Sequence, residues 1–238
     1  MFRKIIKENA KAALRLRYWP YVGVTLLVGL LTGSGFSTGF NFSINSGDLR
    51  EQLQSVPKEV WMGIMIAVMI AGALALGYAI FAGNVFQIGG ARIFLDGYRG
   101  RNWSFSDLVC GFKNGRYWRN VGAMALMTLF ILLGFLCFVI PGIILSYCFA
   151  QVPYILAEDD SISAMGALRR SWNLMDGKKA DLFVFGLSFL GWQILNVLTL
   201  GVLGIFYVNP YMELATAGYY DALVSMEPEV RPVGNEGI

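Results

Sequence analysis

The chain has 238 residues, of which 56% are hydrophobic and only 15% are charged, and its formal net charge is +3. Soluble globular domains carry about 25% charged residues, so this composition excludes that class and indicates a helical membrane protein. The sequence contains no histidine, which excludes histidine-based acid–base catalysis, Ser-His or Cys-His nucleophile pairs and histidine metal ligation. We therefore expect a protein that is not an enzyme and that uses no cofactor and no metal.

Six apolar stretches approach the length of about 20 residues that crosses a bilayer. They cover roughly residues 19–36, 60–84, 119–139, 142–157, 181–198 and 201–224. If the N-terminus is cytoplasmic, Arg50 and Lys58 are the only basic residues on the outer side, as the positive-inside rule requires. The sequence thus predicts an all-α, multi-pass protein of the bacterial cytoplasmic membrane, with six transmembrane helices and both termini in the cytoplasm.

The six helices are expected to form three hairpins, each preceded by a cytoplasmic amphipathic helix. Residues 17–23 and 116–122 share the pattern R-Y-W-x-x-V-G at the start of an outgoing helix. Trp172, followed by Lys178 and Lys179, is a weaker echo before the fifth helix. This pattern predicts an internal repeat, although aromatic and basic residues also anchor unrelated helices at a membrane interface, which is the alternative.

The N-terminal segment has the pattern of a helix that lies on a membrane surface. Lys4, Lys7 and Lys11 fall on one helical face, while Ile6 and Leu14 belong to the other. Corresponding helices are expected near residues 104–116 and 160–176. We expect these segments to contact anionic lipid headgroups or a membrane-protein partner. Nucleic acid is excluded as a partner because the basic residues are dispersed.

The first hairpin differs from the others in its outer loop and its second helix. The loop, about residues 33–59, is expected to be a solvated connection, with partner binding as the alternative. A small residue stands at every fourth position of the second helix: Gly63, Ala67, Ala71, Ala75, Ala79 and Gly83. Small residues allow close approach of helices, so we expect this stripe to pack centrally within the chain or, alternatively, to form a homo-oligomer. The oligomeric state is left open.

Proline interrupts the returning helix of both later hairpins. Pro153 and Pro210 each stand about ten residues after the outer turn, and proline bends a helix and frees a backbone carbonyl. The sequence therefore predicts a kink at each position.

Glu213 is the acidic residue expected deepest within a membrane helix, where a carboxylate is costly. The polar residues expected near it are Asn209, Thr216 and Tyr220 on the same helical face, and Gln151, Gln193 and Asn196 on the fourth and fifth helices. In one interpretation these side chains line a proton- or substrate-responsive cavity of a transporter. In the other, Glu213 is neutral and makes a hydrogen bond between helices.

The remaining acidic and thiol groups are expected to be structural. Glu158 to Asp160 precede a helix whose dipole favours them, so capping is expected rather than cation binding. Cys110, Cys137 and Cys148 are scattered and odd in number, which predicts unpaired thiols. Residues 226–238 are expected to form a disordered cytoplasmic tail after a single domain over residues 1–225.

Several motifs from Phe105 onward resemble the bacterial integral-membrane family known as domain of unknown function 975. They are SFSDLVCGF around Asp107, VIPGII around Pro141, PYILA from Pro153, SWNLMDGKK from Ser171, LSFLGW from Leu187, and NPY with AGYYDAL from Asn209. The resemblance implies a multi-pass membrane protein with no assigned reaction. The family is also distantly similar to the membrane domain of glycerophosphodiester phosphodiesterases, which implies a role near lipid metabolism without implying any catalytic residue.

These features predict a non-enzymatic accessory or interaction protein of the cytoplasmic membrane. The alternative is a small transporter or lipid-handling protein built on the polar stripe around Glu213. An intramembrane enzyme is a third possibility, because serine, tyrosine and carboxylate groups can serve some chemistries without histidine.

Overall fold

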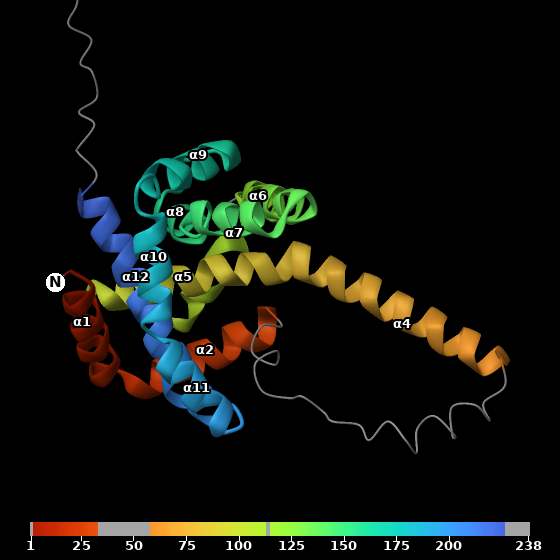
Figure 1. The fold of residues 1–238 in the computed structure, drawn as a ribbon, viewed down its shortest axis with the longest axis horizontal. Coiled ribbons are helices and arrows are strands. Elements are labelled where there is room, and N and C mark those ends of the chain that lie inside the picture. Colours follow the sequence, from red (N-terminus) through yellow and green to blue (C-terminus); the bar gives the residue numbers. More distant parts are fainter. Residues whose placement is uncertain (1, 33–57, 113–114, 227–238) are drawn as a thin grey trace, which may run out of the picture.

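The computed structural model describes residues 2–32, 58–112 and 115–226, and these ranges contain helices and no strands (Figure 1). In chain order the helices are α1 (Phe2–Leu16), α2 (Tyr18–Thr32), α4 (Lys58–Tyr78), η1 (Ala79–Gly83), α5 (Asn84–Tyr98), η2 (Phe105–Phe112), α6 (Tyr117–Cys137), α7 (Val139–Cys148), α8 (Val152–Glu158), α9 (Ala164–Leu174), α10 (Lys179–Leu187), α11 (Leu190–Leu198), η3 (Gly204–Val208) and α12 (Asn209–Met226). The predicted all-α class is confirmed. The expected tail beyond Met226 and most of the expected outer loop lie outside the described residues.

Four helical stretches in the described part of the chain are long and apolar enough to cross a membrane. They are Val60–Tyr98, Tyr117–Cys137, Val139–Glu158 and Lys179–Leu198, while the apolar helix Tyr18–Thr32 is shorter. These lengths are those of a helical membrane protein. The count of six membrane crossings and their arrangement as three hairpins stay predictions.

The second apolar helix continues well beyond its predicted end near residue 84. Through η1 it runs on into α5, which ends at Tyr98. Polar residues such as Asn84 and Arg92 suggested an end of the membrane segment, but no proline follows to stop the helix. The apolar residues in this part of α5, Ile88 and Phe94 among others, are fully buried and hold α5 in the centre of the protein.

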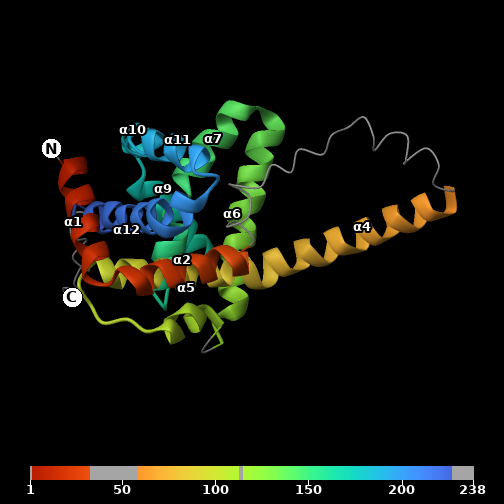
Figure 2. The same cartoon turned by 90° about the horizontal axis from the view of Figure 1, so that it is seen from below.

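The core consists of α5, α8 and α12, with α1 alongside. In the structure α5 packs against both α8 and α12, and α1 lies along α12. Ile155, Leu214 and Tyr220 in this core have no exposed surface. Figure 2 shows α6 standing across α2 and α5 rather than parallel to them. The helices therefore surround a compact centre at varied angles.

The amphipathic helix α1 is covered by the protein itself. Ile6, Ala10 and Leu14, spaced four residues apart, are buried, and the Lys7 ammonium lies 4.2 Å from the centroid of the Phe189 ring. Lys11 is exposed, and its ammonium lies 5.6 Å from the centroid of the Tyr211 ring. Residues of the apolar face of this segment thus pack against α12 and its neighbours, while its contact with lipid headgroups stays a prediction.

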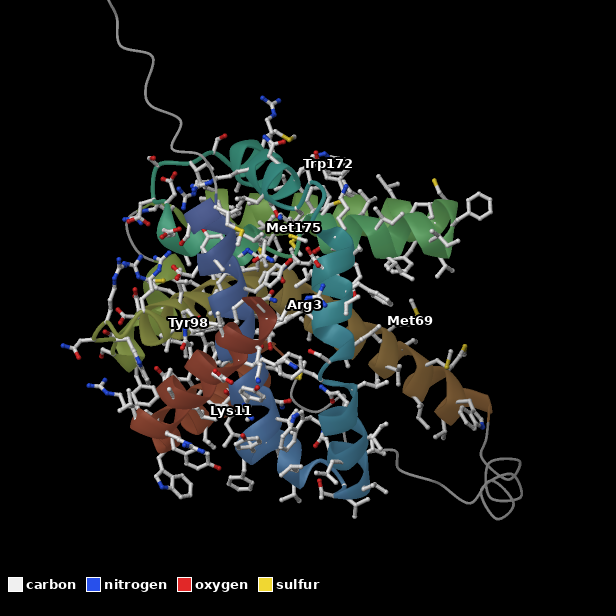
Figure 3. All side chains as sticks on the ribbon, turned by 60° about the vertical axis from the view of Figure 1, so that its left-hand side comes forward. Arg3, Lys11, Met69, Tyr98, Trp172 and Met175 are labelled. Carbon is white, nitrogen blue, oxygen red and sulfur yellow. The ribbon has the colours of Figure 1, made fainter. Side chains whose placement is uncertain are left out.

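In contrast, α4 projects away from the rest of the chain (Figures 1 and 2). Met69, far along this helix in Figure 3, is 71% exposed. Of the small-residue stripe, only Gly83 is buried; the exposed members are Gly63, Ala67, Ala71, Ala75 and Ala79. The prediction that this stripe packs at the centre of the chain is therefore wrong. The spacing of small residues identifies a helix face that can pack closely, but it does not identify the helix against which that face packs.

Candidate functional site

A cavity of about 390 Å³ lies between α2, η1, α5, α8 and α12. Its polar lining residues are Thr32, Asn84, Gln87, Tyr154, Glu213 and Thr216. Its apolar lining residues are Val28, Ala79, Gly83, Ala91, Ala150 and Pro153. Ligand cavities in proteins have volumes of roughly 300 to 1,000 Å³ and combine apolar walls with a few polar groups. In size and lining, this cavity fits that description.

Glu213 supplies the carboxylate of the cavity. Its side chain is exposed, because it faces the open space of the cavity. Among the described residues, no hydrogen bond or ion pair joins its carboxylate to another group, and no basic side chain lines the cavity. The expected interhelical hydrogen bond is therefore absent from this arrangement, and the carboxylate faces the cavity.

Three helical stretches contribute to the cavity lining through α5, α8 and α12, and each of them is interrupted near the cavity. Between α4 and α5 stands the π-helical turn η1, which contributes Ala79 and Gly83 to the lining. A turn separates α7 from α8 next to Pro153. The π-helical turn η3 comes directly before Pro210 and the helix that carries Glu213. Such interruptions occur often at functional sites, because they redirect side chains and free backbone groups.

Tyrosines of the repeated R-Y-W pattern bind both π-helical turns. The hydroxyl of Tyr18 donates to the Phe206 carbonyl in η3 at 2.8 Å, and the hydroxyl of Tyr117 donates to the Phe81 carbonyl in η1 at 2.9 Å. The carbonyl of Phe206 is free because the residue four positions later is Pro210, which has no N–H. In each case a tyrosine of the repeated pattern donates to a backbone carbonyl within a π-helical turn.

The interruption between α7 and α8 is stabilised in a similar way, by a hydroxyl group from α9. There the N–H of Val152 donates to the Phe149 carbonyl at 3.1 Å, so the Cys148 carbonyl lacks its usual helical donor. The Ser171 hydroxyl donates to this carbonyl at 2.8 Å. Each interruption near the cavity is therefore stabilised by a hydroxyl from another part of the chain.

A chain of polar contacts leads from the cavity toward the ends of the core helices. The ring of Tyr154, which lines the cavity, stacks on Tyr220 with centroids 5.4 Å apart. The Tyr220 hydroxyl donates to Glu158 Oε2 at 2.6 Å. Arg99 then bridges the core: its Nη1 donates to Glu158 Oε1 and its Nε to Asp221 Oδ1, both at 2.6 Å. This network closes the cavity on that side and joins the ends of α5, α8 and α12.

The other residues predicted near Glu213 are placed elsewhere. Gln151 is buried and its Nε2 contacts Met175 Sδ at 3.8 Å, while its Oε1 is buried without a hydrogen-bond partner among the described residues. The Nε2 of Gln193 donates to a methionine sulfur in α12. Asn196 Oδ1 accepts from the Gly204 N–H at 2.6 Å. Asn209, at the start of α12, is not part of the lining. Only Thr216 joins Glu213 in the cavity.

Sequence reasoning missed several polar members of the cavity lining. Asn84 and Gln87, three residues apart, lie on one face of α5. They follow the predicted end of the second membrane helix, so they were not treated as membrane residues. Two polar residues at helical spacing inside a long, proline-free helix would have been the signal. Tyr154 is part of the motif PYILA, and nothing in the sequence separately indicated that it lines a cavity.

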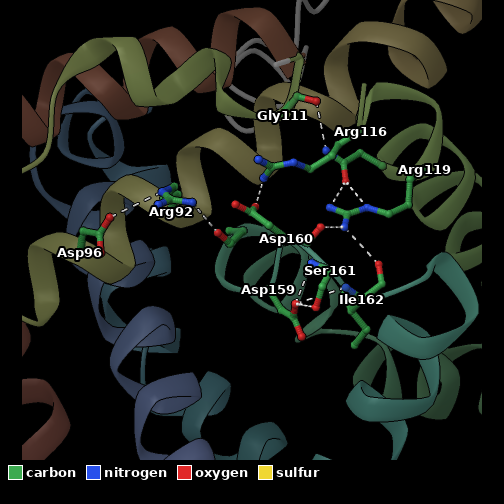
Figure 4. Close-up of polar contacts among 11 residues, drawn as sticks. Arg92, Asp96, Gly111, Arg116, Arg119, Asp159, Asp160, Ser161 and Ile162 are labelled. Carbon is green, nitrogen blue, oxygen red and sulfur yellow. Dashed lines mark hydrogen bonds and ion pairs between the residues drawn. The ribbon is translucent and has the colours of Figure 1, made fainter. Parts of the chain in front are cut away.

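The acidic cluster at the end of α8 is divided among separate partners, and Figure 4 shows those of Asp159 and Asp160. Glu158 belongs to the Arg99 network. Asp159 accepts hydrogen bonds from Ser161 and Ile162, which lower the pKa of Asp159, the largest cause being the Ser161 hydroxyl. Asp160 pairs with Arg116. The carboxylates therefore organise the turn before α9.

Residues 123–227 match the model of a family described as "Protein of unknown function (DUF975)". The match covers less than half of the chain and supports the family resemblance that the motifs from Phe105 onward indicate. It includes α8 and α12, which carry Tyr154 and Glu213, whereas α2, η1 and α5 lie outside it. The curated proteins and the solved structures gave no match.

Proposed function

We propose that this chain is a non-enzymatic, multi-pass protein of the bacterial cytoplasmic membrane that binds a small molecule or a lipid headgroup in the cavity around Glu213, as a transporter or lipid-handling protein. The observation that carries the proposal is the carboxylate of Glu213, which has no hydrogen bond or ion pair among the described residues and faces a cavity with five further polar side chains. An ionisable group within a membrane helix is costly, and proteins retain such groups mainly where they act on a ligand, an ion or a proton.

The interrupted helices support the same proposal. Membrane transporters commonly bind their substrates where helices are broken, because the freed backbone and the local change of direction create a polar site within the bilayer. Here the three interruptions, at η1, before α8 and at η3, all adjoin the elements that form the cavity. The cavity thus combines an ionisable side chain with interrupted helices, and both features are otherwise destabilising in a membrane.

We further propose three units, each with a surface helix and a pair of membrane helices, and both termini in the cytoplasm. The hydroxyl contacts of Tyr18, Tyr117 and Ser171 support this arrangement. Each comes from the first part of one unit and reaches the interrupted helix of another. The bias of basic residues supports the orientation. A distant likeness to the membrane domain of glycerophosphodiester phosphodiesterases would agree with a lipid ligand.

A second candidate function is that of an accessory protein for another membrane component. The exposed surface of α4 favours it, since the apolar residues of this helix are largely uncovered by the described part of the chain. Lipid covers such a surface equally well in a membrane. For this reason the cavity, which has a specific lining, is the stronger basis for a function.

The proposal is tested by extracting the tagged protein from its native membrane into polymer nanodiscs and analysing the co-purifying lipids and small molecules by mass spectrometry. We expect one species to be enriched with the wild-type protein and reduced at least about tenfold in Glu213→Gln, because the substitution removes the charge without changing the shape. Glu8→Gln, on the exposed face of α1, is the matched control and is expected to retain it.

Equal recovery of all species in the wild type and in Glu213→Gln would contradict the proposal. Enrichment of a stoichiometric protein partner, unaffected by Glu213→Gln, would favour the accessory function instead. Thermal unfolding of both variants in detergent is the check that each is folded, and we expect a cooperative transition for each.

A further inference from the structure

Resting on the proposed function, we infer that the ligand of the cavity carries an ammonium group. The charge of the lining is the first reason. Glu213 supplies one negative charge, and the other polar groups, Thr32, Asn84, Gln87, Tyr154 and Thr216, are neutral hydroxyls and amides. The described residues place no basic side chain in the lining, so an anionic ligand would meet the carboxylate without compensation. A cation is instead attracted by the carboxylate, and more strongly at a partly enclosed site than in bulk water.

The shape and chemistry of the walls are the second reason. Val28, Ala79, Ala91, Ala150 and Pro153 offer apolar surface beside Glu213, so a hydrated metal ion would fit the lining poorly. Tyr154 adds an aromatic ring, and aromatic rings attract ammonium and quaternary ammonium groups. The side-chain oxygens of Asn84, Gln87 and Thr216 can accept hydrogen bonds from a protonated amine. An ammonium group with a few attached carbon atoms matches both the negative charge of Glu213 and the apolar walls of the cavity.

The cavity is large enough for such a ligand and closed on one side. Its volume of about 390 Å³ lies in the range of small-molecule sites. The stacked Tyr154 and Tyr220 rings and the Glu158–Arg99–Asp221 network separate it from the ends of the core helices. The ligand therefore reaches Glu213 from another side of the cavity.

The inference is tested with choline and its uncharged carbon analogue, 3,3-dimethylbutan-1-ol, which have the same shape. The full chain is placed in nanodiscs of phosphatidylglycerol, which has no ammonium group, and binding is measured by calorimetry. We expect choline to bind at least about tenfold more tightly than the analogue, and Glu213→Gln to remove this preference. Glu8→Gln is expected to behave as the wild type.

Ammonium groups come from free amines or from lipid headgroups, and a second set of nanodiscs distinguishes them. If phosphatidylethanolamine in the nanodiscs competes with choline, the headgroup is the source; if choline affinity is unchanged, the ligand is a free amine. Equal binding of choline and its analogue, or choline binding that survives Glu213→Gln, would overturn the inference. A neutral species lost from Glu213→Gln in the co-purification experiment would overturn it too, while leaving the proposed function intact.

Discussion

Replacing Gly89 with alanine is expected to lower the free energy of unfolding by about 3 kcal/mol or more, the upper range for overpacking of a core. Gly89 lies in the middle of α5, where the backbone of η2 crosses it. A Cβ atom at this position would stand 2.0 Å from the carbonyl oxygen of Leu108 and 2.5 Å from its carbonyl carbon. Backbone atoms cannot rotate away as a side chain can, so α5 and η2 must separate.

Gly122→Ala in α6 is the matched control for this substitution. No atom lies within 4 Å of the position that its Cβ would take, and alanine favours a helix over glycine by about 1 kcal/mol. Unfolding in detergent, followed by intrinsic tryptophan fluorescence, measures both variants. Similar stability of Gly89→Ala and Gly122→Ala would show that η2 does not pack on α5 as described.

Removing the guanidinium group of Arg99 is expected to have the second largest effect. In Arg99→Met, the carboxylates of Glu158 and Asp221 lose their common partner, while the aliphatic packing is largely kept. Loss of one member of a buried ion pair costs about 3–5 kcal/mol. Because the side chains of Glu158 and Asp221 keep 30% and 29% of their surface exposed, water compensates in part, and we expect a loss of about 2 kcal/mol.

Arg101→Met is the control for the loss of an arginine at the same end of α5. Arg101 is 63% exposed and approaches Asp96 only at 3.5 Å, so its removal is expected to change the free energy of unfolding by less than about 0.5 kcal/mol. The same detergent unfolding experiment compares the two. A stability of Arg99→Met within error of Arg101→Met would mean that the network does not join the core helices.

The sequence allowed the helical membrane class to be predicted, because length and hydropathy depend on local composition. It also identified Glu213 and Thr216, since a carboxylate in an apolar helix and a polar residue one turn away stand out without knowledge of the fold. The R-Y-W tyrosines and Pro210 were noticed separately. That Tyr18 donates to the carbonyl that Pro210 frees depends on contact between residues far apart in sequence, which no local pattern records.

Two predictions failed for the same physical reason. The stripe from Gly63 to Gly83 can pack, and Asn84 can end a membrane segment, but both outcomes depend on the neighbouring helix. In the structure the neighbours gather around α5 and leave most of α4 uncovered. Periodicity shows which face of a helix is suited for contact, whereas topology decides where the contact forms.

The claim that Glu213 faces an accessible cavity is tested most directly by labelling single cysteines on α12. Cys110, Cys137 and Cys148 are first replaced by alanine, and Thr216→Cys is compared with Ala215→Cys under a small, water-soluble thiol reagent in nanodiscs. Thr216 lines the cavity, whereas Ala215 is fully buried among the core helices. We predict rapid labelling at position 216 and none at 215; equal labelling of both positions, or of neither, would contradict the cavity and the function built on it.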